Sequence, residues 1–252
     1  MPRPAGGTAA IVMLVLATMS LVPGSARAQR SAGGYLLGAP SGTFTIRTGY
    51  DAAMANSDLF AFVTNELTLR KRDFASPMLA ADFGFRLNSN VDATFGAGYS
   101  RGAARSEFRD WLDNNNLPIE QQTEFIRVPL TVNLKAYLEP PGRAIGHYAW
   151  IPAKFAPYVG GGVGTMWYRF RQSGDFIDFN TTEVYPDTYS SSAWTPMANA
   201  FVGSDFGLRP GLAFNVEARY SWARGPLSRD FSGFHRLDLS GIAFTAGVTF
   251  RY

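Results

Sequence analysis

The chain has 252 residues, with 23 Lys and Arg side chains against 20 Asp and Glu, and no Cys. The absence of cysteine excludes disulfides and thiolate metal sites, and the near balance of charge gives no reason to expect a nucleic-acid partner. Beyond residue 28 no apolar stretch approaches the roughly 18 residues that a transmembrane helix needs.

The N-terminal residues have the form of a secretory signal peptide. Arg3 precedes an apolar run over 9–22, and residues 26–28 (Ala-Arg-Ala) form a small-x-small cleavage site. The run is short for a membrane-spanning helix, and an uncleaved anchor is the alternative. Removal of Arg3 and Arg27 lowers the 23 basic side chains to 21, against 20 acidic ones.

Eight later stretches alternate between apolar side chains and small or polar ones, which is typical of β-strands with two different faces. In the clearest stretch, the even-numbered residues from Ile126 to Leu138 form an apolar row. The odd-numbered residues from Phe125 to Tyr137 form the other row. Pro129 cannot donate to the strand ladder, so we predict a bulge there. The predicted strands cover about residues 43–51, 76–87, 91–100, 123–138, 155–171, 193–207, 212–222 and 239–252.

The last stretch ends on an aromatic residue, Tyr252, and its apolar face includes Phe244, Val248 and Phe250. A soluble sandwich that buries such a face in its core is one alternative. Behind a secretory signal, however, the repeated pattern indicates an all-β fold. It would be a single closed antiparallel eight-stranded transmembrane β-barrel, an up-and-down meander whose apolar face meets lipid. We predict a cleaved signal peptide over 1–28, a flexible leader over 29–42 and a barrel domain over 43–252.

With the signal peptide, the glycine-rich segment Tyr158–Gly164 and the closing segment Ala246–Tyr252 resemble the small Gram-negative outer-membrane β-barrel proteins, of the eight-stranded OmpA, OmpX and OmpW types. The resemblance covers Thr43 to Tyr252 and implies a location in the bacterial outer membrane. It also implies that the terminal residues form the assembly signal that the barrel-assembly machinery reads. The matching residues are Phe244, Val248, Phe250 and Tyr252.

The connections between the predicted strands alternate in length. Outer-membrane barrels have short periplasmic turns and longer outer loops, so both termini are expected in the periplasm. The connection over 139–154 is long where a short turn is expected. Either strands four and five extend through Tyr148 and Trp150 as a periplasmic hairpin, or the strand count is wrong there. Long connections are predicted at 52–75, 101–122, 172–192 and 223–238, and short ones at 88–90 and 208–211.

If the apolar rows face lipid, the alternate rows line the interior, because a charge on the lipid side costs roughly 2–4 kcal/mol near the midplane. Side chains just fill an eight-stranded barrel, whereas an open pore needs about 16–18 strands. We therefore predict a packed polar interior in which each charge is paired. Its members are Arg47, Asp82, Arg86, Asp92, Arg127, Lys135, Asp205, Glu217, Arg219 and Arg251, with Asn133, Asn199 and Asn215.

No residue is predicted to be catalytic, or to bind a cofactor or a metal. Glu217 and Asp205 have the chemistry of paired acid–base carboxylates, but structural salt bridges to arginine explain them more simply. Residues 160–162 are three glycines, yet the lysine and helix pattern of a phosphate loop is missing.

The two histidines, His147 and His235, are far apart in the sequence and make no metal site. Some barrels of the resembled kind are lipid A-modifying enzymes that use a histidine with a serine or a carboxylate. Asp238 and Ser240 follow His235, but Leu237 stands where the serine of a His-x-Ser pair would be.

The first long connection has its own pattern. Ser57 is predicted to cap a short helix in which Leu59, Phe62 and Val63 share a face. Residues 70–72 (Arg-Lys-Arg) follow, either as a contact for anionic lipopolysaccharide or as a solvated loop base. Aromatic residues near strand ends are predicted to form interfacial girdles, with ligand stacking as the alternative. They are Tyr50, Tyr99, Trp167, Tyr168, Tyr220, Trp222, Phe250 and Tyr252.

These features predict a monomeric, non-enzymatic outer-membrane barrel that acts through its outer loops in envelope structure or surface interaction. Its expected partners are outer-membrane lipid, lipopolysaccharide and the barrel-assembly machinery, with no cofactor and no nucleic acid. The alternative is a narrow channel for small hydrophobic solutes or ions, of the OmpW kind. A lipid A-modifying enzyme is the third class.

Overall fold

The computed structural model describes residues 34–113, 116–146, 148–178, 181 and 183–252. The predicted signal peptide, residues 29–33 of the predicted leader and His147 lie outside the described residues. None of the helices in the described part is both long and apolar enough to cross a membrane.

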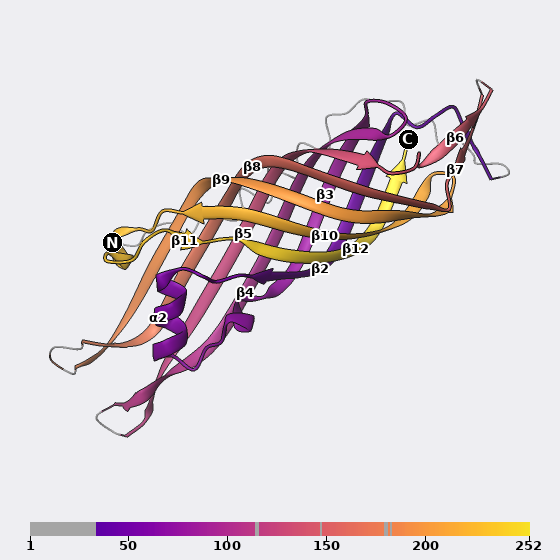
Figure 1. Cartoon of the computed structure of the whole chain (residues 1–252). Helices are drawn as coiled ribbons and strands as arrows, with labels where there is room; N and C mark the ends of the chain where they lie inside the picture. The colour runs from indigo at the N-terminus through magenta and orange to yellow at the C-terminus, as the bar shows by residue number, and fades with distance from the viewer. Residues whose placement is uncertain (1–33, 114–115, 147, 179–180, 182) are drawn as a thin grey trace, which may run out of the picture. The chain divides into compact units, whose positions relative to one another are not determined.

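Eight long strands form a ring of antiparallel neighbours (Figure 1). Each strand pairs with the next one along the chain, and the last strand, β12, pairs with the first, β2. The all-β prediction and the eight strands are therefore confirmed. The strands are β2 (Gly42–Ala53), β3 (Ser76–Arg86), β4 (Val91–Leu112), β5 (Pro118–Tyr137), β8 (Phe155–Ile177), β9 (Val184–Arg209), β10 (Leu212–Gly225) and β12 (Gly241–Arg251).

Strands β4, β5, β8 and β9 extend much further than predicted. Arg105 of β4 pairs with Gln122 of β5, and Gln172 of β8 pairs with Tyr189 of β9. The long loops predicted over 101–122 and 172–192 are therefore wrong over most of their length, because these residues form hairpins. The outward row of the extensions is polar rather than apolar, so the alternation that marks the rest of each strand is lost there.

The bulge predicted at Pro129 is also wrong. Pro129 lies opposite Met166 in an unbroken register between β5 and β8. On the other side of β5, the pairs Leu130–Ala97 and Arg127–Ser100 keep one register. The missing N–H of proline is accommodated without an inserted residue.

Side chains sort by face along each strand, as the alternation predicts. Val132 and Phe95 on the outer face are 51% and 54% exposed, whereas Arg127 and Glu217 on the inner face are 2% and 6% exposed. This is the reverse of a soluble core, so the sandwich alternative is wrong. The outward rows form an apolar belt over 44–52 of β2, 77–85 of β3, 91–99 of β4, 126–136 of β5, 155–167 of β8, 194–206 of β9, 212–222 of β10 and 242–250 of β12.

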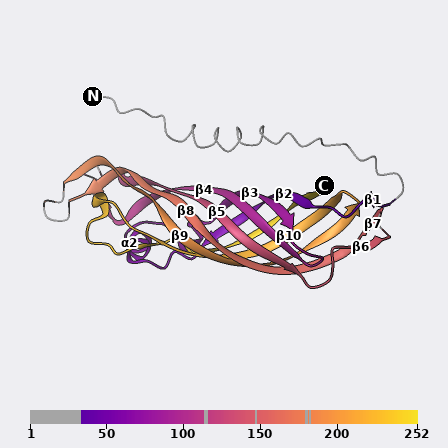
Figure 2. The ribbon, with the colours of Figure 1, turned by 90° about the horizontal axis from the view of Figure 1, so that it is seen from above.

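A small sheet lies at the end of the ring where the chain terminates (Figure 2). It contains β6 (Gly142–Ile145), β7 (Ala149–Pro152) and β1 (Leu36–Leu37), and we call it the end sheet. The long 139–154 connection is thus a hairpin, but one that forms its own sheet instead of extending β5 and β8. Part of the predicted flexible leader, residues 36–37, is a strand of this sheet.

The connection between β2 and β3 lies at the opposite end of the ring, where α2 (Asp58–Glu66) and the 3-10 helix η2 (Lys71–Phe74) are found (Figure 1). The chain between β10 and β12 contributes η3 (Arg229–Phe231) and β11 (Leu237–Asp238) at the same end. These segments join the inward side chains of β5, β8 and β9 in one apolar cluster.

Candidate functional site: the filled interior of the ring

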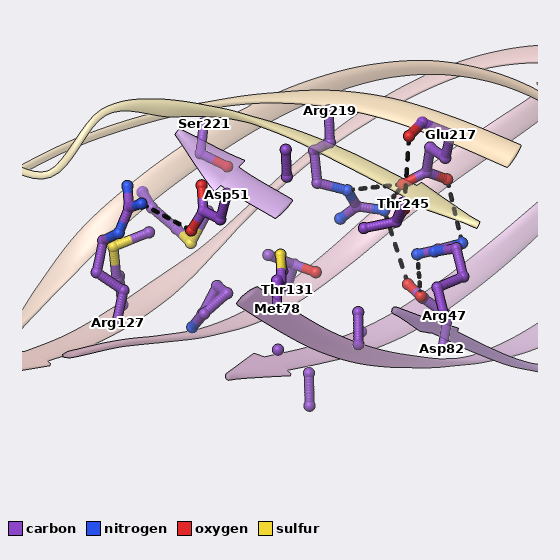
Figure 3. Close-up of a pocket in the computed structure, with 18 residues that line it drawn as sticks. Arg47, Asp51, Met78, Asp82, Arg127, Thr131, Glu217, Arg219, Ser221 and Thr245 are labelled. Atoms are coloured by element: carbon purple, nitrogen blue, oxygen red, sulfur yellow. Dashed lines mark hydrogen bonds and ion pairs between the residues drawn. The ribbon is translucent and has the colours of Figure 1, made fainter. Parts of the chain in front are cut away.

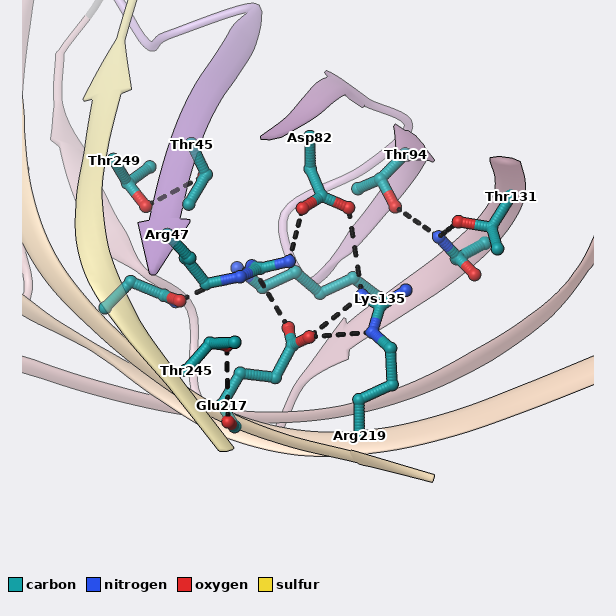
Figure 4. A network of polar contacts seen from close by, with 12 residues as sticks. Thr45, Arg47, Asp82, Thr94, Thr131, Lys135, Glu217, Arg219, Thr245 and Thr249 are labelled. Atoms are coloured by element: carbon teal, nitrogen blue, oxygen red, sulfur yellow. Dashed lines mark hydrogen bonds and ion pairs between the residues drawn. The ribbon is translucent and has the colours of Figure 1, made fainter. Parts of the chain in front are cut away.

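Four charged side chains form the centre of the interior polar network (Figure 4). The two terminal nitrogens of Arg47 face the carboxylates of Asp82 and Glu217, the second at 3.2 Å. Arg219 Nη2 lies 2.9 Å from Glu217 Oε1 and 3.7 Å from Asp82 Oδ1. Two cations and two anions thus alternate in a cycle, which compensates the cost of burying each charge.

A second cluster joins this centre through hydroxyl and amide groups. Lys135 Nζ lies 3.0 Å from Asp205 Oδ2, and Asn215 Nδ2 donates to Asp205 Oδ1 at 2.6 Å. Asn215 also donates to the hydroxyl of Tyr158 at 2.8 Å, and this hydroxyl donates to Glu217 Oε2 at 3.0 Å. Because Lys135 on β5 and Asp205 on β9 come from strands that are not neighbours, the network crosses the interior.

Two further pairs lie nearer the ends of the ring. Arg127 Nη2 lies 2.8 Å from Asp51 Oδ2, and its Nη1 donates to the carbonyl of Leu239 at 3.2 Å. Arg86 and Asp92 form the other pair. The structure therefore gives every predicted interior charge except Arg251 an ion-pair partner. Asp51 was not predicted as a partner, although its place in the same row as Arg47 was a usable signal.

The end sheet packs against Arg251, the last inward residue of β12. The guanidinium of Arg251 lies 5.5 Å from the ring centre of Trp150, and both side chains are buried. Among the described residues, its two terminal nitrogens have no hydrogen-bond partner. Trp150 and Arg251 thus occupy the interior at this end of the ring.

A cavity of about 30 Å³ lies in the described interior between the polar network and the apolar cluster (Figure 3). Arg127, Met166 and Met197 line it on one side, and Glu217 and Arg219 on the other. Such a volume holds about one water molecule. It is too small for a sugar or another solute of comparable size.

The apolar cluster, which we call the apolar plug, is organised around Phe60 of α2. The Phe60 ring is 0% exposed, and its centre lies 4.7 Å from that of Phe74, 5.6 Å from that of Phe125 and 5.7 Å from that of Phe170. Phe125 and Phe170 point inward from β5 and β8. The plug therefore closes the end of the interior opposite to the end sheet.

Three predictions about this region need correction. Leu59 and Val63 are buried as predicted, but Phe60 joins them instead of Phe62, which is 38% exposed. Ser57 stands at the N-cap position of α2, yet its side chain makes no capping bond within the described chain. Tyr168 is buried in the plug and is not a girdle residue, because it lies on the inward row of β8.

The groups considered for catalysis are held in structural contacts. Asp205 and Glu217 are each ion-paired. The exposed ring of His235 contacts Asp58 Oδ2 through Nδ1 at 2.7 Å. The backbone amide of His235 donates to the same carboxylate, and this hydrogen bond is the main cause of the lowered pKa of Asp58. Asp238 accepts the amide hydrogens of Asn56 and Ser240. Among the described residues, no group of three or more His, Cys, Asp or Glu side chains is arranged to hold a metal ion.

Three residues of the predicted terminal signal lie on the outer face of β12, and Tyr252 directly follows this strand. Phe244, Phe250 and Tyr252 are exposed, and Val248 is half-buried in the same row. At the other end, residues 70–72 are exposed, and Lys71 Nζ donates to Asn56 Oδ1 at 2.7 Å.

A ring of eight antiparallel strands with charges inside and an apolar belt outside defines the class of protein, a small β-barrel whose interior is filled by its own side chains.

No protein-family model matches the chain, and no curated protein matches it. Among solved structures, the chain is similar to Neisserial surface protein A (NspA), with 11% identity over 87% of this chain and 98% of that one, at a TM-score of 0.46. It is also similar to the outer membrane protein OprG from Pseudomonas aeruginosa, with 14% identity over 85% and 98% of the two chains, at a TM-score of 0.43. The N-terminal β-barrel domain of Pseudomonas aeruginosa OprF shares 11% identity over 84% and 98%, at a TM-score of 0.37.

Proposed function

We propose that the chain is a bacterial outer-membrane protein, exported by a cleaved signal peptide, whose ring is a closed transmembrane barrel. The apolar belt supports this proposal. Its rows, such as 126–136 of β5, are about ten residues long, which is the length that a tilted strand needs to cross a bilayer. Trp194 and Trp222 are exposed at the edge of the belt that lies nearer to α2 and the extended hairpins, as interfacial aromatic residues are.

The barrel acts as a non-conducting envelope protein, through the parts that project beyond the membrane. The observation that carries this proposal is the succession of three obstructions along the interior. These are the end sheet with Trp150 and Arg251, the cross-linked polar network, and the apolar plug around Phe60. The hairpins β4–β5 and β8–β9, with α2 beside them, form the projecting surface (Figure 1).

The filled interior disfavours a passage for hydrophobic solutes. Such a passage needs an apolar entry with free volume, whereas the side chains of the plug are packed against one another. A terminal assembly signal at Phe244, Val248, Phe250 and Tyr252 and a monomeric state belong to the same proposal.

Conductance across a planar lipid bilayer tests the proposal. The mature chain, refolded and inserted, is expected to give no steady current, because the end sheet, the polar network and the apolar plug each obstruct its described interior. A triple variant, Phe60→Ser with Arg127→Ser and Lys135→Ser, removes a side chain at three heights and serves as the comparison. Steady single-channel steps from the unaltered chain would refute the non-conducting role, whatever the triple variant does.

A further inference from the structure

Arginine side chains gather on one side of the ring, at the edge of the apolar belt. Arg101 on β4 pairs across Ile126 on β5 with Arg169 on β8, so these three residues form one row across three strands. The adjacent row contains Val128 and Trp167 and belongs to the belt. Arg105 and Arg171 lie in the next rows outward. We call Arg101, Arg105, Arg169 and Arg171 the arginine cluster.

The alternation of the strands points all four side chains away from the interior. Arg101, Arg105 and Arg171 are exposed, and Arg169 is half-buried. One carboxylate, that of Glu124, lies among them, and it is used by Arg101 at 2.9 Å. Within the described part of the chain, the structure gives Arg105, Arg169 and Arg171 no ion-pair partner.

The cluster does not continue onto β2, β3 and β12. At the corresponding height, the outward positions of β2, β3 and β12 are occupied by the uncharged residues Ala52, Pro77 and Ile242. The cluster is therefore a local feature of β4, β5 and β8. A uniform rim of charge around the barrel would place charged residues at Ala52, Pro77 and Ile242 as well.

Position and charge together specify the ligand. A molecule that contacts the belt and the cluster at once needs apolar chains, which would lie beside Trp167. It also needs an anionic group, which would lie beside the arginines that follow Trp167 along β8. The guanidinium of Arg169 lies 5.3 Å from the ring centre of Trp167, which places cation and interfacial aromatic side by side. Guanidinium groups pair with phosphate oxygens in a bidentate manner. We propose that the arginine cluster binds the phosphate groups of a phosphorylated amphiphile in the membrane leaflet that surrounds the projecting end of the barrel.

This inference rests on the proposed function, since it requires the belt to lie in a bilayer. It also replaces the sequence-based expectation that residues 70–72 bind an anionic lipid. Those residues follow α2 at the plugged end of the ring and lie outside the apolar belt, and Lys71 already donates to Asn56. Residues 70–72 therefore provide a control with the same change of charge.

The test measures lipid binding by the refolded mature chain in detergent micelles, using native mass spectrometry and bisphosphorylated lipid A as the probe. The cluster variant is Arg105→Gln with Arg169→Gln and Arg171→Gln. The control is Arg70→Gln with Lys71→Gln and Arg72→Gln, which removes the same three charges. The cluster variant is expected to lose affinity about 100-fold if each arginine acts independently, and at least about tenfold if their contacts overlap. The control is expected to stay within about twofold of the unaltered chain.

Three comparisons complete the test. Lipid A without phosphates is expected to bind the unaltered chain as weakly as bisphosphorylated lipid A binds the cluster variant, and inorganic phosphate alone is expected to compete poorly. Replacement of the three arginines by lysine is expected to restore part of the affinity, which a folding defect would not allow. Equal losses in the cluster variant and the control, or equal binding of lipid A with and without phosphates, would overturn the inference.

Insertion into phosphatidylcholine vesicles is measured separately, from the heat-dependent shift in gel mobility of the folded barrel. A chain that does not insert contradicts the proposed function. A chain that inserts, but whose cluster variant binds lipid A like the unaltered chain, contradicts only the arginine cluster as the site.

Discussion

Truncation of Phe60 to alanine probes the apolar plug. The Phe60 ring is fully buried and surrounded by the rings of Phe74, Phe125 and Phe170. A buried phenylalanine removes roughly 150–200 Å² of surface from water, which at about 25 cal/mol per Å² is worth about 4–5 kcal/mol. Measured truncations of this kind cost about 3–5 kcal/mol. We therefore expect Phe60→Ala to lower the free energy of opening of α2 by about 3–4 kcal/mol.

Hydrogen exchange of peptides that cover residues 58–66, followed by mass spectrometry in detergent micelles, measures this effect. A loss of 3–4 kcal/mol corresponds to an exchange that is faster by roughly 100- to 1,000-fold. Phe62→Ala is the matched control, since Phe62 lies on the same helix and is 38% exposed. Equal acceleration in the two variants, or none in Phe60→Ala, would refute the packing described for the plug.

Three other perturbations have expected outcomes. Glu217→Gln leaves Arg219 without its nearest carboxylate, and it is expected to lower the free energy of unfolding by about 3–5 kcal/mol in urea unfolding from phosphatidylcholine vesicles. Glu124→Gln, at a more exposed pair, should lower it by at most about 1 kcal/mol. Similar losses in the two variants would argue against a buried network. Val132→Arg puts a charge on the belt and is expected to lower the free energy of unfolding by about 2–4 kcal/mol in the same assay. Gln122→Arg, beyond the belt, should change it little. An unchanged free energy of unfolding in Val132→Arg would contradict the lipid-facing row. The lowered pKa of Asp58 implies that its ionised form stabilises the contact with His235. This contribution is complete above a pH of about 4, the usual aspartate value, and is lost as the pH falls further through the lowered pKa. The protection factors of residues 58–66, which are the ratios of intrinsic to observed exchange rates at each pH, should therefore fall below pH 4 in the unaltered chain but not in Asp58→Asn. Identical pH profiles of the two chains would count against the contact.

The ring and its two faces follow from the sequence because a β-strand presents alternate residues to opposite sides. Where one side meets an apolar environment and the other a polar interior, the contrast is strong, as between Val132 and Asn133. In the parts of the hairpins beyond the belt, outward and inward residues no longer differ clearly in polarity. Arg105 faces outward there and Ser106 inward, so no periodic signal marks the strand.

The plug shows a different limit. In an α-helix successive residues turn by about 100°, so Phe60 and Phe62 lie about equally far on either side of the line through Leu59 and Val63. Local periodicity therefore does not decide which phenylalanine is buried. The choice depends on Phe125 and Phe170, which come from strands far away in the sequence.

Partners in the interior were predictable as a group but not as pairs. The alternation places Arg127 inside, and burial requires that its charge be paired. That the partner is Asp51 depends on how far β2 and β5 are staggered around the ring, which the alternation does not specify. The strand at residues 36–37 is missed for a related reason, because its pairing with β7 is its main stabilising contact.

The orientation of the two faces is tested most directly by labelling single cysteines, since the natural chain contains none. Val132→Cys on the belt and Gln122→Cys, on the outward row beyond the belt, are each coupled to an environment-sensitive fluorophore before refolding into vesicles that contain brominated lipid. Strong quenching at position 132 with weak quenching at position 122 is the result expected for a belt in contact with acyl chains. Weak quenching or water-like emission at position 132 would contradict it.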